Sequence, residues 1–247
     1  LPLSVLVPQA MKVLEIEAEK IKEGVLELAY TQKIHVEKDQ NDINVYLMPY
    51  YLSENGVCKE MIRLAQYDFE NLNIDVDHEI KLIEREEGIK LAQNQVMAVK
   101  EAIEKGVVII TGGPGTGKTT TINTIIKVFE NNDQKVVLAA PTGRAAKRMS
   151  ETSNKEAKTI HRLLEMGFGM DSDELTFMKN EEDPIDADVV ILDEVSMVDI
   201  VLMYSLLRAI KSGTRLLIVG DSDQLPSVGA GNVLKDLIDS EVINTVR

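Results

Sequence analysis

The chain has 247 residues, of which 44% are hydrophobic and 28% are charged, as in a soluble globular protein with one large domain or one domain and a smaller companion. Its formal net charge of −14 excludes a general polyanion-binding surface, so any nucleic-acid path must be a local groove in an acidic body. No apolar run approaches the roughly 18 residues that a membrane helix needs, which excludes a membrane protein.

The first ten residues, LPLSVLVPQA, have neither the basic start nor the small-residue cleavage site of a signal peptide. They also lack an initiator methionine, so we expect the chain to begin inside a longer parent. The lone cysteine, Cys58, excludes an intramolecular disulfide and predicts a cytoplasmic location. Three scattered histidines and one cysteine also exclude a zinc cluster.

The first 69 residues predict a small mixed α/β domain that resembles a winged-helix fragment. Apolar residues follow a helical period in two stretches and alternate in two short runs on either side of a polar turn. The expected elements are a helix within Met11–Leu28, strands Ile34–Glu37 and Ile43–Leu47, a turn at Asp39–Asp42 and a helix over Tyr50–Gln66. Because this domain is acidic, a structural or protein-contacting role is favoured over DNA binding.

A charge-rich stretch, residues 70–90, is expected to connect this domain to a larger one over residues 91–247. The larger domain alternates helical patterns with continuous apolar runs, which predicts an α/β fold with a parallel sheet covered on both faces. The predicted strands are Val107–Thr111, Val136–Ala140, Val189–Leu192 and Leu216–Val219. The polar stretch Met166–Asp186 is expected to be an inserted loop or hairpin.

The clearest motif is VVIITGGPGTGKTTT, an apolar strand followed by a glycine-rich turn and a helix start. It contains G-x-x-x-x-G-K-[ST] as Gly112, Gly117, Lys118 and Thr119, the pattern of a phosphate-binding loop. Glycines let the backbone N–H groups approach the phosphates, and the helix adds the positive end of its dipole. We expect Lys118 to contact the β- and γ-phosphates of ATP and the Thr119 hydroxyl to ligate Mg²⁺.

Two further strand ends carry polar side chains to the same edge of the predicted sheet. In VVILDEVSMVD, Asp193 is expected to hold Mg²⁺ and Glu194 to activate the attacking water, which favours hydrolysis over phosphotransfer. In LLIVGDSDQLPSVGAGN, the carboxamide of Gln224 is placed to sense the γ-phosphate. Taken singly, the first pattern also fits a solvated acidic strand end and the second a polar loop.

Together these motifs resemble motifs I, II and III of superfamily 1 helicases. The segments APTGRAAKRMSE (Ala140–Glu151) and TIHRLL (Thr159–Leu164) are similar to the RecD-like branch, the family of the exodeoxyribonuclease V alpha subunit and its relatives with long N-termini. LAQNQVMAV is similar to the adenine-reading Q motif of that family, with Gln95 as its glutamine. The resemblance covers about residues 91–247 and is looser before them.

The resemblance implies a RecA-like motor lobe with ATP and Mg²⁺ as cofactors and single-stranded DNA as partner. It places Gln95 on adenine, Asp193 and Glu194 on the metal and water, and Gln224 on the γ-phosphate. The implied phosphate contacts are Gly113, Pro114, Gly115, Thr116, Gly117, Lys118, Thr119 and Thr120. The implied DNA contacts are Thr142, Gly143, Arg144 and His161.

Some of these DNA contacts have competing interpretations. Thr142, Gly143 and Arg144 follow a strand, where backbone amides and a guanidinium can hold a DNA phosphate. Lys147 and Arg148 fit a solvated helix face nearly as well as a nucleic-acid contact, and a buried helix histidine is almost as plausible for position 161.

The chain stops at INTVR, where the family continues into a second RecA-like lobe. That lobe supplies arginine fingers, which are worth about 10³–10⁵ in rate in related NTPases. The sequence shows no evident substitute arginine. We therefore expect the chain alone to bind ATP weakly and hydrolyse it slowly, while its parent moves along single-stranded DNA; the family implies 5′→3′ polarity.

Two other functions remain open at this point. One is a nucleotide-gated interaction module that binds a protein through the N-terminal domain and never unwinds DNA. The other is an RNA-directed superfamily 1 motor, which shares every catalytic residue. Stimulation of ATP hydrolysis by DNA and by RNA oligomers separates these alternatives, because a DNA track need not tolerate the 2′-hydroxyl.

Overall fold

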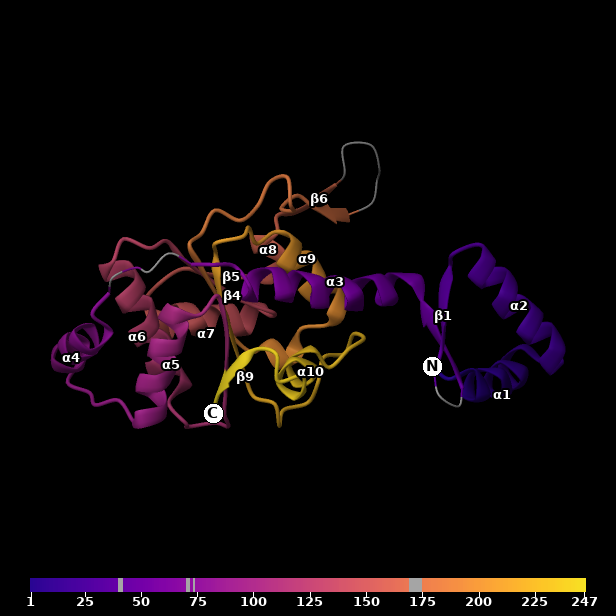
Figure 1. Ribbon diagram of the computed structural model, residues 1–247, viewed down its shortest axis with the longest axis horizontal. Coiled ribbons are helices and arrows are strands. Elements are labelled where there is room, and N and C mark those ends of the chain that lie inside the picture. Colours follow the sequence, from indigo (N-terminus) through magenta and orange to yellow (C-terminus); the bar gives the residue numbers. More distant parts are fainter. Residues whose placement is uncertain (40–41, 70–71, 73, 169–174) are drawn as a thin grey trace. The chain divides into compact units, whose positions relative to one another are not determined.

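The computed structural model describes residues 1–39, 42–69, 72, 74–168 and 175–247. It divides into two compact units, Leu1–Gly56 and Val57–Arg247, each with its own hydrophobic core (Figure 1). Within the described ranges, every helix is too short or too polar to cross a lipid bilayer.

The first unit packs two helices against an antiparallel strand pair. Val25, Ile34 and Val45 form its small buried core. The predicted strand pair is confirmed, whereas residues 40 and 41 of the predicted turn lie outside the described residues. In chain order the elements are α1 (Leu3–Leu14), α2 (Ala18–Tyr30), β1 (Ile34–Lys38), β2 (Ile43–Leu47) and the start of α3 (Met48–Ala65).

The single helix expected within Met11–Leu28 is wrong, because the chain forms two helices there. Glu15 ends α1 in the left-handed conformation, with φ 56° and ψ 37°, and α2 starts three residues later. The apolar residues around the break concealed it in the sequence pattern, since Val13 and Ile16 continue the helical period although their side chains are exposed.

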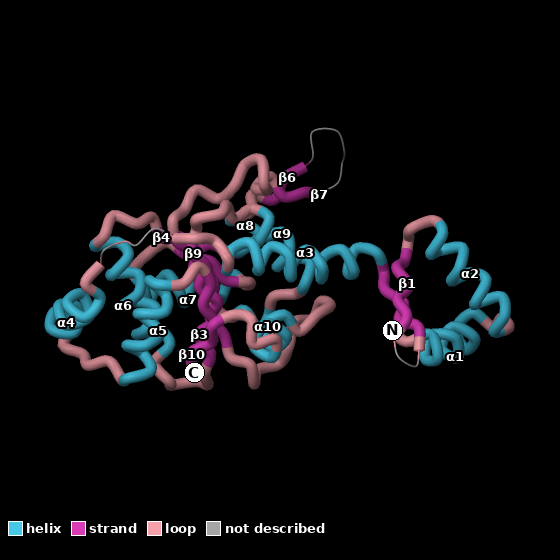
Figure 2. The backbone as a smooth tube through the Cα atoms, in the orientation of Figure 1, coloured by secondary structure: helices cyan, strands magenta, loops and turns pink. Residues whose placement is uncertain are grey.

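The second unit is built on a six-stranded parallel sheet with the order β10-β3-β9-β8-β4-β5. Figure 2 draws its strands in magenta and labels β3, β4, β9 and β10. The four inner strands coincide with the four predicted apolar runs. The sequence does not indicate the two edge strands, because three residues are too few to show a period. The strands are β3 (Val107–Thr111), β4 (Val136–Ala140), β5 (Ala157–Thr159), β8 (Val189–Leu192), β9 (Arg215–Gly220) and β10 (Asn244–Val246).

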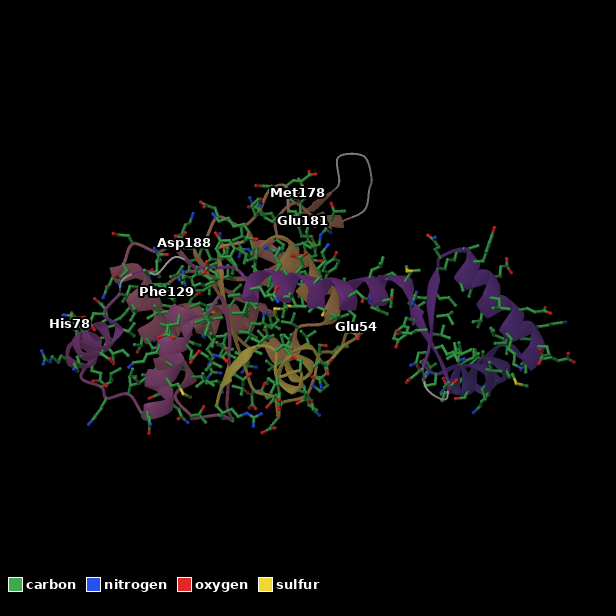
Figure 3. All side chains as sticks on the ribbon, in the orientation of Figure 1. Glu54, His78, Phe129, Met178, Glu181 and Asp188 are labelled. Carbon is green, nitrogen blue, oxygen red and sulfur yellow. The ribbon has the colours of Figure 1, made fainter. Side chains whose placement is uncertain are left out.

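Helices cover both faces of this sheet, as the continuous apolar strands predict. Val108 and Ile110 of β3 face one core and Val107 and Ile109 face the other, because successive side chains of a strand alternate. Phe129, labelled in Figure 3, is fully buried in the first of these cores. The first core packs α4 (Val76–Glu87), α5 (Gln93–Glu104) and α6 (Lys118–Asn131); the second packs the end of α3, α8 (Ile160–Leu163), α9 (Ile200–Arg208) and α10 (Val233–Asp239).

Two segments outside the sheet contain regular structure. Helix α4 lies within the stretch expected to be a connector, and its buried residues Ile80 and Ile83 pack on the sheet core. The polar insertion forms an antiparallel pair, β6 (Met166–Phe168) and β7 (Leu175–Phe177), as the expectation of a loop or hairpin allows. Residues 169–174 of this insertion lie outside the described residues.

Side chains satisfy both ends of helix α9. At its start, the Asp199 carboxylate accepts a hydrogen bond from the Leu202 N–H at 2.8 Å. At its end, the Arg63 guanidinium donates to the carbonyl oxygen of Leu207 in the last turn and to that of Ile210 just beyond it, at 3.3 and 2.7 Å. These contacts fix the helix that covers the strands carrying the site described below.

We expect Asp199→Ala to lower the free energy of unfolding by about 1 kcal/mol, because the substitution removes the N-cap of α9. Urea denaturation followed by circular dichroism measures this. Ser205→Ala, on the same helix, is the control and should change the value by less than about 0.5 kcal/mol, since it removes only a solvent-exposed hydrogen bond from the Ser205 hydroxyl to the Val201 carbonyl. Equal effects of the two substitutions would contradict the capping role.

Candidate functional site

The glycine-rich loop connects the end of β3 to the start of α6. Gly115 and Gly117 have φ angles of 79° and 85°, which residues with a Cβ rarely adopt. Helix α6 begins at Gly117 without a capping side chain, whereas Thr142 and Asp199 cap the starts of α7 (Gly143–Ser153) and α9. The first N–H groups of α6 are therefore open to an anion.

The Lys118 ammonium is folded back onto this loop. Its Nζ donates hydrogen bonds to the carbonyl oxygens of Gly112 and, at 2.9 Å, Gly113. The Thr116 hydroxyl also donates to the Gly113 carbonyl, at 2.9 Å. These bonds hold the Lys118 ammonium on the loop where phosphates would bind. A bound phosphate would replace the two carbonyl oxygens as the partner of the ammonium.

Gln95 joins the start of α5 to the same loop. Its Oε1 accepts a hydrogen bond from the Ala92 N–H at 2.8 Å, and its Nε2 donates to the Gly117 carbonyl at 3.2 Å. Gln95 also lines a cavity of about 380 Å³ next to the loop, together with Ile110 and Val246. The carboxamide is engaged at both ends within the chain, and its contact with adenine remains a prediction.

We expect Gly117→Ala to weaken nucleotide binding about tenfold or more. The added Cβ would lie 2.3 Å from Nε2 of Gln95, so the Gln95 side chain would have to move. The left-handed backbone at this position adds a cost of about 1–2 kcal/mol for alanine. Fluorescence titration with an ATP analogue measures the affinity. Gly24→Ala is the control, because its Cβ would have no atom within 4 Å. Wild-type affinity in Gly117→Ala would contradict the need for glycine.

The acidic pair Asp193–Glu194 follows β8 at a sharp turn of the chain. Glu194 has φ 55° and ψ 38°, a left-handed conformation that is strained for a residue with a Cβ. Asp193 Oδ1 accepts a hydrogen bond from the Glu194 N–H at 2.8 Å. Burial raises the pKa of Asp193 above its ordinary value, while the Glu194 N–H and the charges of Lys118 and Arg148 lower it. A partly buried carboxylate whose desolvation the neighbouring groups do not fully offset is suited to a bound cation.

Gln224 is held between two neighbouring elements. Its Nε2 donates to Asp221 Oδ2 at 3.4 Å, and its Oε1 accepts from the Ser196 hydroxyl at 3.5 Å. Asp221 is buried at the end of β9, and Ser196 lies in the short 3₁₀ helix Val195–Met197 that follows Glu194. The carboxamide therefore connects the segments after β8 and β9, and any movement of Gln224 acts on both.

These elements meet around one cavity of about 360 Å³. Thr120 points elsewhere, toward a cavity beside α4, and Gln95 lines the neighbouring one. The predicted residues that line the shared cavity are Gly113, Pro114, Gly115, Thr116, Gly117, Lys118, Thr119, Asp193, Glu194 and Gln224.

The side chains at this cavity fit a magnesium ion bound together with phosphates. Among the described residues, no group of three or more His, Cys, Asp or Glu side chains is arranged to hold a metal. Thr119 and Asp193 offer a hydroxyl and a carboxylate oxygen beside the phosphate loop. Mg²⁺ is usually bound by one or two carboxylates plus substrate phosphates and water, which agrees with this sparse set of ligands.

The structure adds residues that the sequence analysis did not assign to this cavity. Arg148 lines it, and its Nη1 lies 3.9 Å from Glu194 Oε1, a position at this cavity that the sequence did not indicate. Asp221 and Ser196 were not assigned a role either, although both follow predicted strands. The signal for Arg148 was present in its helix: buried Ala145 and Ala146 hold α7 close to the sheet.

The expected DNA contacts lie on two adjacent strand ends. Ala140 of β4 pairs with Thr159 of β5, so Thr142 and His161 each follow that pair by two residues at the carboxyl edge. Arg144 and His161 are exposed. A buried helix histidine at position 161 is therefore wrong; its ring lies 5.9 Å from that of Phe177.

Comparison with known protein families identifies a matching AAA domain over residues 95–230. The chain is 43% identical over 141 residues to the ATP-dependent RecD2 DNA helicase of Deinococcus radiodurans, covering 57% of this chain and 19% of that protein. It is 35% identical over 218 residues to the RecBCD enzyme subunit RecD of Mycolicibacterium smegmatis, covering 79% of this chain and 37% of that subunit.

A solved structure of Pif1 from a Bacteroides species in complex with ADP-AlF4 matches with a TM-score of 0.42 and 21% identity, covering 62% of this chain and 36% of that one.

The curated relatives confirm the resemblance to RecD-like helicases that the motifs indicate. The chain spans only about a fifth to two fifths of their length.

Proposed function

The chain belongs to the AAA domain family, and from this premise we propose that it is the nucleotide-hydrolysing lobe of an ATP-dependent DNA helicase that moves along single-stranded DNA. The observation that carries the proposal is the cavity of about 360 Å³ at which the phosphate loop, Asp193, Glu194 and Gln224 meet. A glycine-rich loop opposite a carboxylate pair is the arrangement that hydrolysis of a triphosphate needs. The name of one curated relative, the ATP-dependent RecD2 DNA helicase, supports DNA as the track.

Binding of ATP would begin at the uncapped start of α6. The open N–H groups and the helix dipole attract the phosphates, and Lys118 exchanges its bonds to the Gly112 and Gly113 carbonyls for phosphate oxygens. The neighbouring cavity of about 380 Å³, lined by Gln95, Ile110 and Val246, is the space for adenine. The triphosphate would thus lie with its terminal phosphate toward the acidic pair.

Hydrolysis would use Glu194 as the general base. Glu194 accepts a proton from a water whose oxygen attacks the γ-phosphorus; the bond to the bridging oxygen breaks and its electron pair stays on ADP. Thr119 and Asp193 would hold Mg²⁺, which offsets the negative charge of the phosphates when bound. Lys118 stabilises the charge that develops between the β- and γ-phosphates.

Loss of the γ-phosphate would be sensed through Gln224. Its carboxamide is tied to Asp221 and Ser196 only by long hydrogen bonds of 3.4 and 3.5 Å, so a phosphate oxygen competes with them readily. Because Ser196 belongs to the segment after β8 and Asp221 ends β9, a change of partner at Gln224 reaches both strand ends.

Single-stranded DNA would lie along the carboxyl edge of β4 and β5. Thr142 and Gly143 present the start of α7, and Arg144 and His161 are exposed next to it. An exposed guanidinium beside the backbone N–H groups that follow β4 supports this path through an otherwise acidic chain. His161 offers a ring for stacking on a base.

We expect Arg144→Ala to weaken binding of single-stranded oligonucleotides regardless of their sequence. Loss of one phosphate contact should reduce the slope of log affinity against log salt by about 0.7. Fluorescence anisotropy at several salt concentrations measures both quantities. Arg85→Ala is the control, because Arg85 is exposed on α4 and its substitution removes the same charge. If Arg144→Ala left the salt slope unchanged, the contact between Arg144 and a DNA phosphate would be contradicted.

We infer two finer properties from the resemblance to RecD-like helicases. The direction of movement is 5′→3′, and the chain works with a second lobe in a longer protein, as the length of the relatives supports. The chain by itself would then turn over ATP slowly. Rapid, DNA-stimulated hydrolysis by these 247 residues alone would contradict the need for a second lobe.

We also infer that the first unit contacts a protein rather than DNA. Its helices expose large apolar side chains, with Val13, Leu26 and Tyr30 at 77, 70 and 89% of their full exposure. Exposed apolar side chains in an acidic unit favour a protein surface over a phosphate backbone.

A further inference from the structure

Helix α7 carries a second cation to the nucleotide cavity. Its buried face consists of Ala145, Ala146 and Met149, which pack on the sheet. Thr152 follows Arg148 by four residues, so the two side chains lie on the same face of the helix. Both line the cavity together with the phosphate loop. Arg148 therefore reaches the cavity from a different element than Lys118, which is the first residue of α6.

The Arg148 guanidinium is held by a single weak contact. Its Nη1 lies 3.9 Å from Glu194 Oε1, and 73% of its side chain is exposed. Within the described part of the chain it makes no hydrogen bond to a protein atom, so its five N–H donors are available to a ligand. A long contact between partly exposed charges contributes little to stability, which leaves the guanidinium free to change partners.

Other arginines of this unit are committed to the fold. Arg63 donates to carbonyl oxygens at the end of α9, and both Nε and Nη2 of Arg208 donate to the Glu181 carboxylate. Arg215 is buried, with its guanidinium 4.5 Å from the Phe69 ring. Removing any of these would change the structure, whereas Arg148 has no such structural partner.

We propose that Arg148 binds the terminal phosphate of the bound triphosphate and so distinguishes ATP from ADP. A guanidinium matches the geometry of phosphate oxygens and forms charge-assisted hydrogen bonds with them. Lys118 lies on the loop, beside the carbonyls of Gly112 and Gly113, while Arg148 stands beside Glu194, where the terminal phosphate and the attacking water would lie. This inference rests on the proposed function and goes beyond it by naming the residue that reads the third phosphate.

The pair with Glu194 gives Arg148 two alternating partners. In the nucleotide-free chain its guanidinium faces the Glu194 carboxylate. When Arg148 turns to the terminal phosphate, that carboxylate is released to accept a proton from water. Arg148 would therefore link the presence of the third phosphate to the availability of the base.

Equilibrium titrations with the non-hydrolysable analogue AMP-PNP and with ADP, each with magnesium, test the proposal on the whole chain. We expect Arg148→Ala to weaken AMP-PNP binding about tenfold while ADP binding changes less than about twofold. Arg148→Lys should restore part of the loss, because it keeps the charge but not the planar fork. The neighbouring exposed residue provides the control: Lys147→Ala, whose ammonium lies 3.8 Å from Glu151, should change neither affinity.

Combining these changes with Glu194→Gln tests the exchange of partners. Removing the carboxylate charge should raise AMP-PNP affinity by up to about fivefold when Arg148 is present and have no such effect in Arg148→Ala. Equal losses for AMP-PNP and ADP in Arg148→Ala, or no loss for either, would overturn the proposal. If the unmodified chain bound neither nucleotide, the proposed function itself would fail, which is a distinct outcome.

Discussion

Replacing Lys118 by alanine is expected to lower the rate of ATP hydrolysis about 10²–10³-fold, the usual effect of removing one group that stabilises developing charge. Its ammonium is bonded to the carbonyl oxygens of Gly112 and Gly113, on the loop where the phosphates would bind. Among the residues that the structure describes, its side chain makes hydrogen bonds only to that loop, so we expect the thermal melting profile to be preserved. Single-turnover hydrolysis at saturating ATP measures the rate.

The control lies on the same helix. Lys127 of α6 pairs with Glu87 at the surface, and Lys127→Ala removes the same charge without touching the loop. We expect it to keep the full rate of hydrolysis. A Lys118→Ala variant that hydrolyses ATP, or drives unwinding by the longer protein, at the normal rate would show that the role given to Lys118 is wrong.

Glu194→Gln is expected to lower hydrolysis about 10²–10⁴-fold without weakening nucleotide binding, because it removes a general base and conserves its shape. Glutamine keeps the size of the side chain at a position where the backbone is already strained, with φ 55°. The variant should therefore trap bound ATP. Rapid-quench measurement of the chemical step, alongside AMP-PNP titration, separates the two effects.

Glu151→Gln is the matched control for this change. Glu151 lies on α7 with its carboxylate 3.8 Å from the Lys147 ammonium, and both side chains are mostly exposed. We expect its rate of hydrolysis to stay within about twofold of the unmodified chain. Normal turnover in Glu194→Gln would assign the base to another residue, while loss of binding in that variant would make Glu194 a nucleotide ligand rather than a base.

The inner strands of the sheet could be predicted because their apolar runs are local features of the sequence. Four apolar runs of four or more residues correspond to β3, β4, β8 and β9, since each strand is buried on both faces. Once those strands are parallel, their carboxyl ends share an edge, and the polar residues that follow them must gather there. The convergence of Lys118, Asp193 and Gln224 on one cavity follows from that rule.

The features that escaped prediction depend on contacts distant in sequence or on single backbone angles. The break between α1 and α2 rests on the left-handed conformation of Glu15, which no periodic pattern reveals. Edge strand β10 pairs with β3 from the far end of the chain. Arg148 reaches the nucleotide cavity because small alanines bring α7 close to the sheet, and sequence shows the charge but not the direction in which it points.

The ladder between β3 and β9 decides which changes of length the site tolerates. Thr111 pairs with Gly220, so the loop bearing Lys118 and the turn bearing Gln224 leave the sheet from the same rung. One residue added inside either strand would shift that exit and turn every following side chain toward the opposite core. Duplications or deletions within β3 or β9 should therefore abolish the site even where every catalytic side chain is retained.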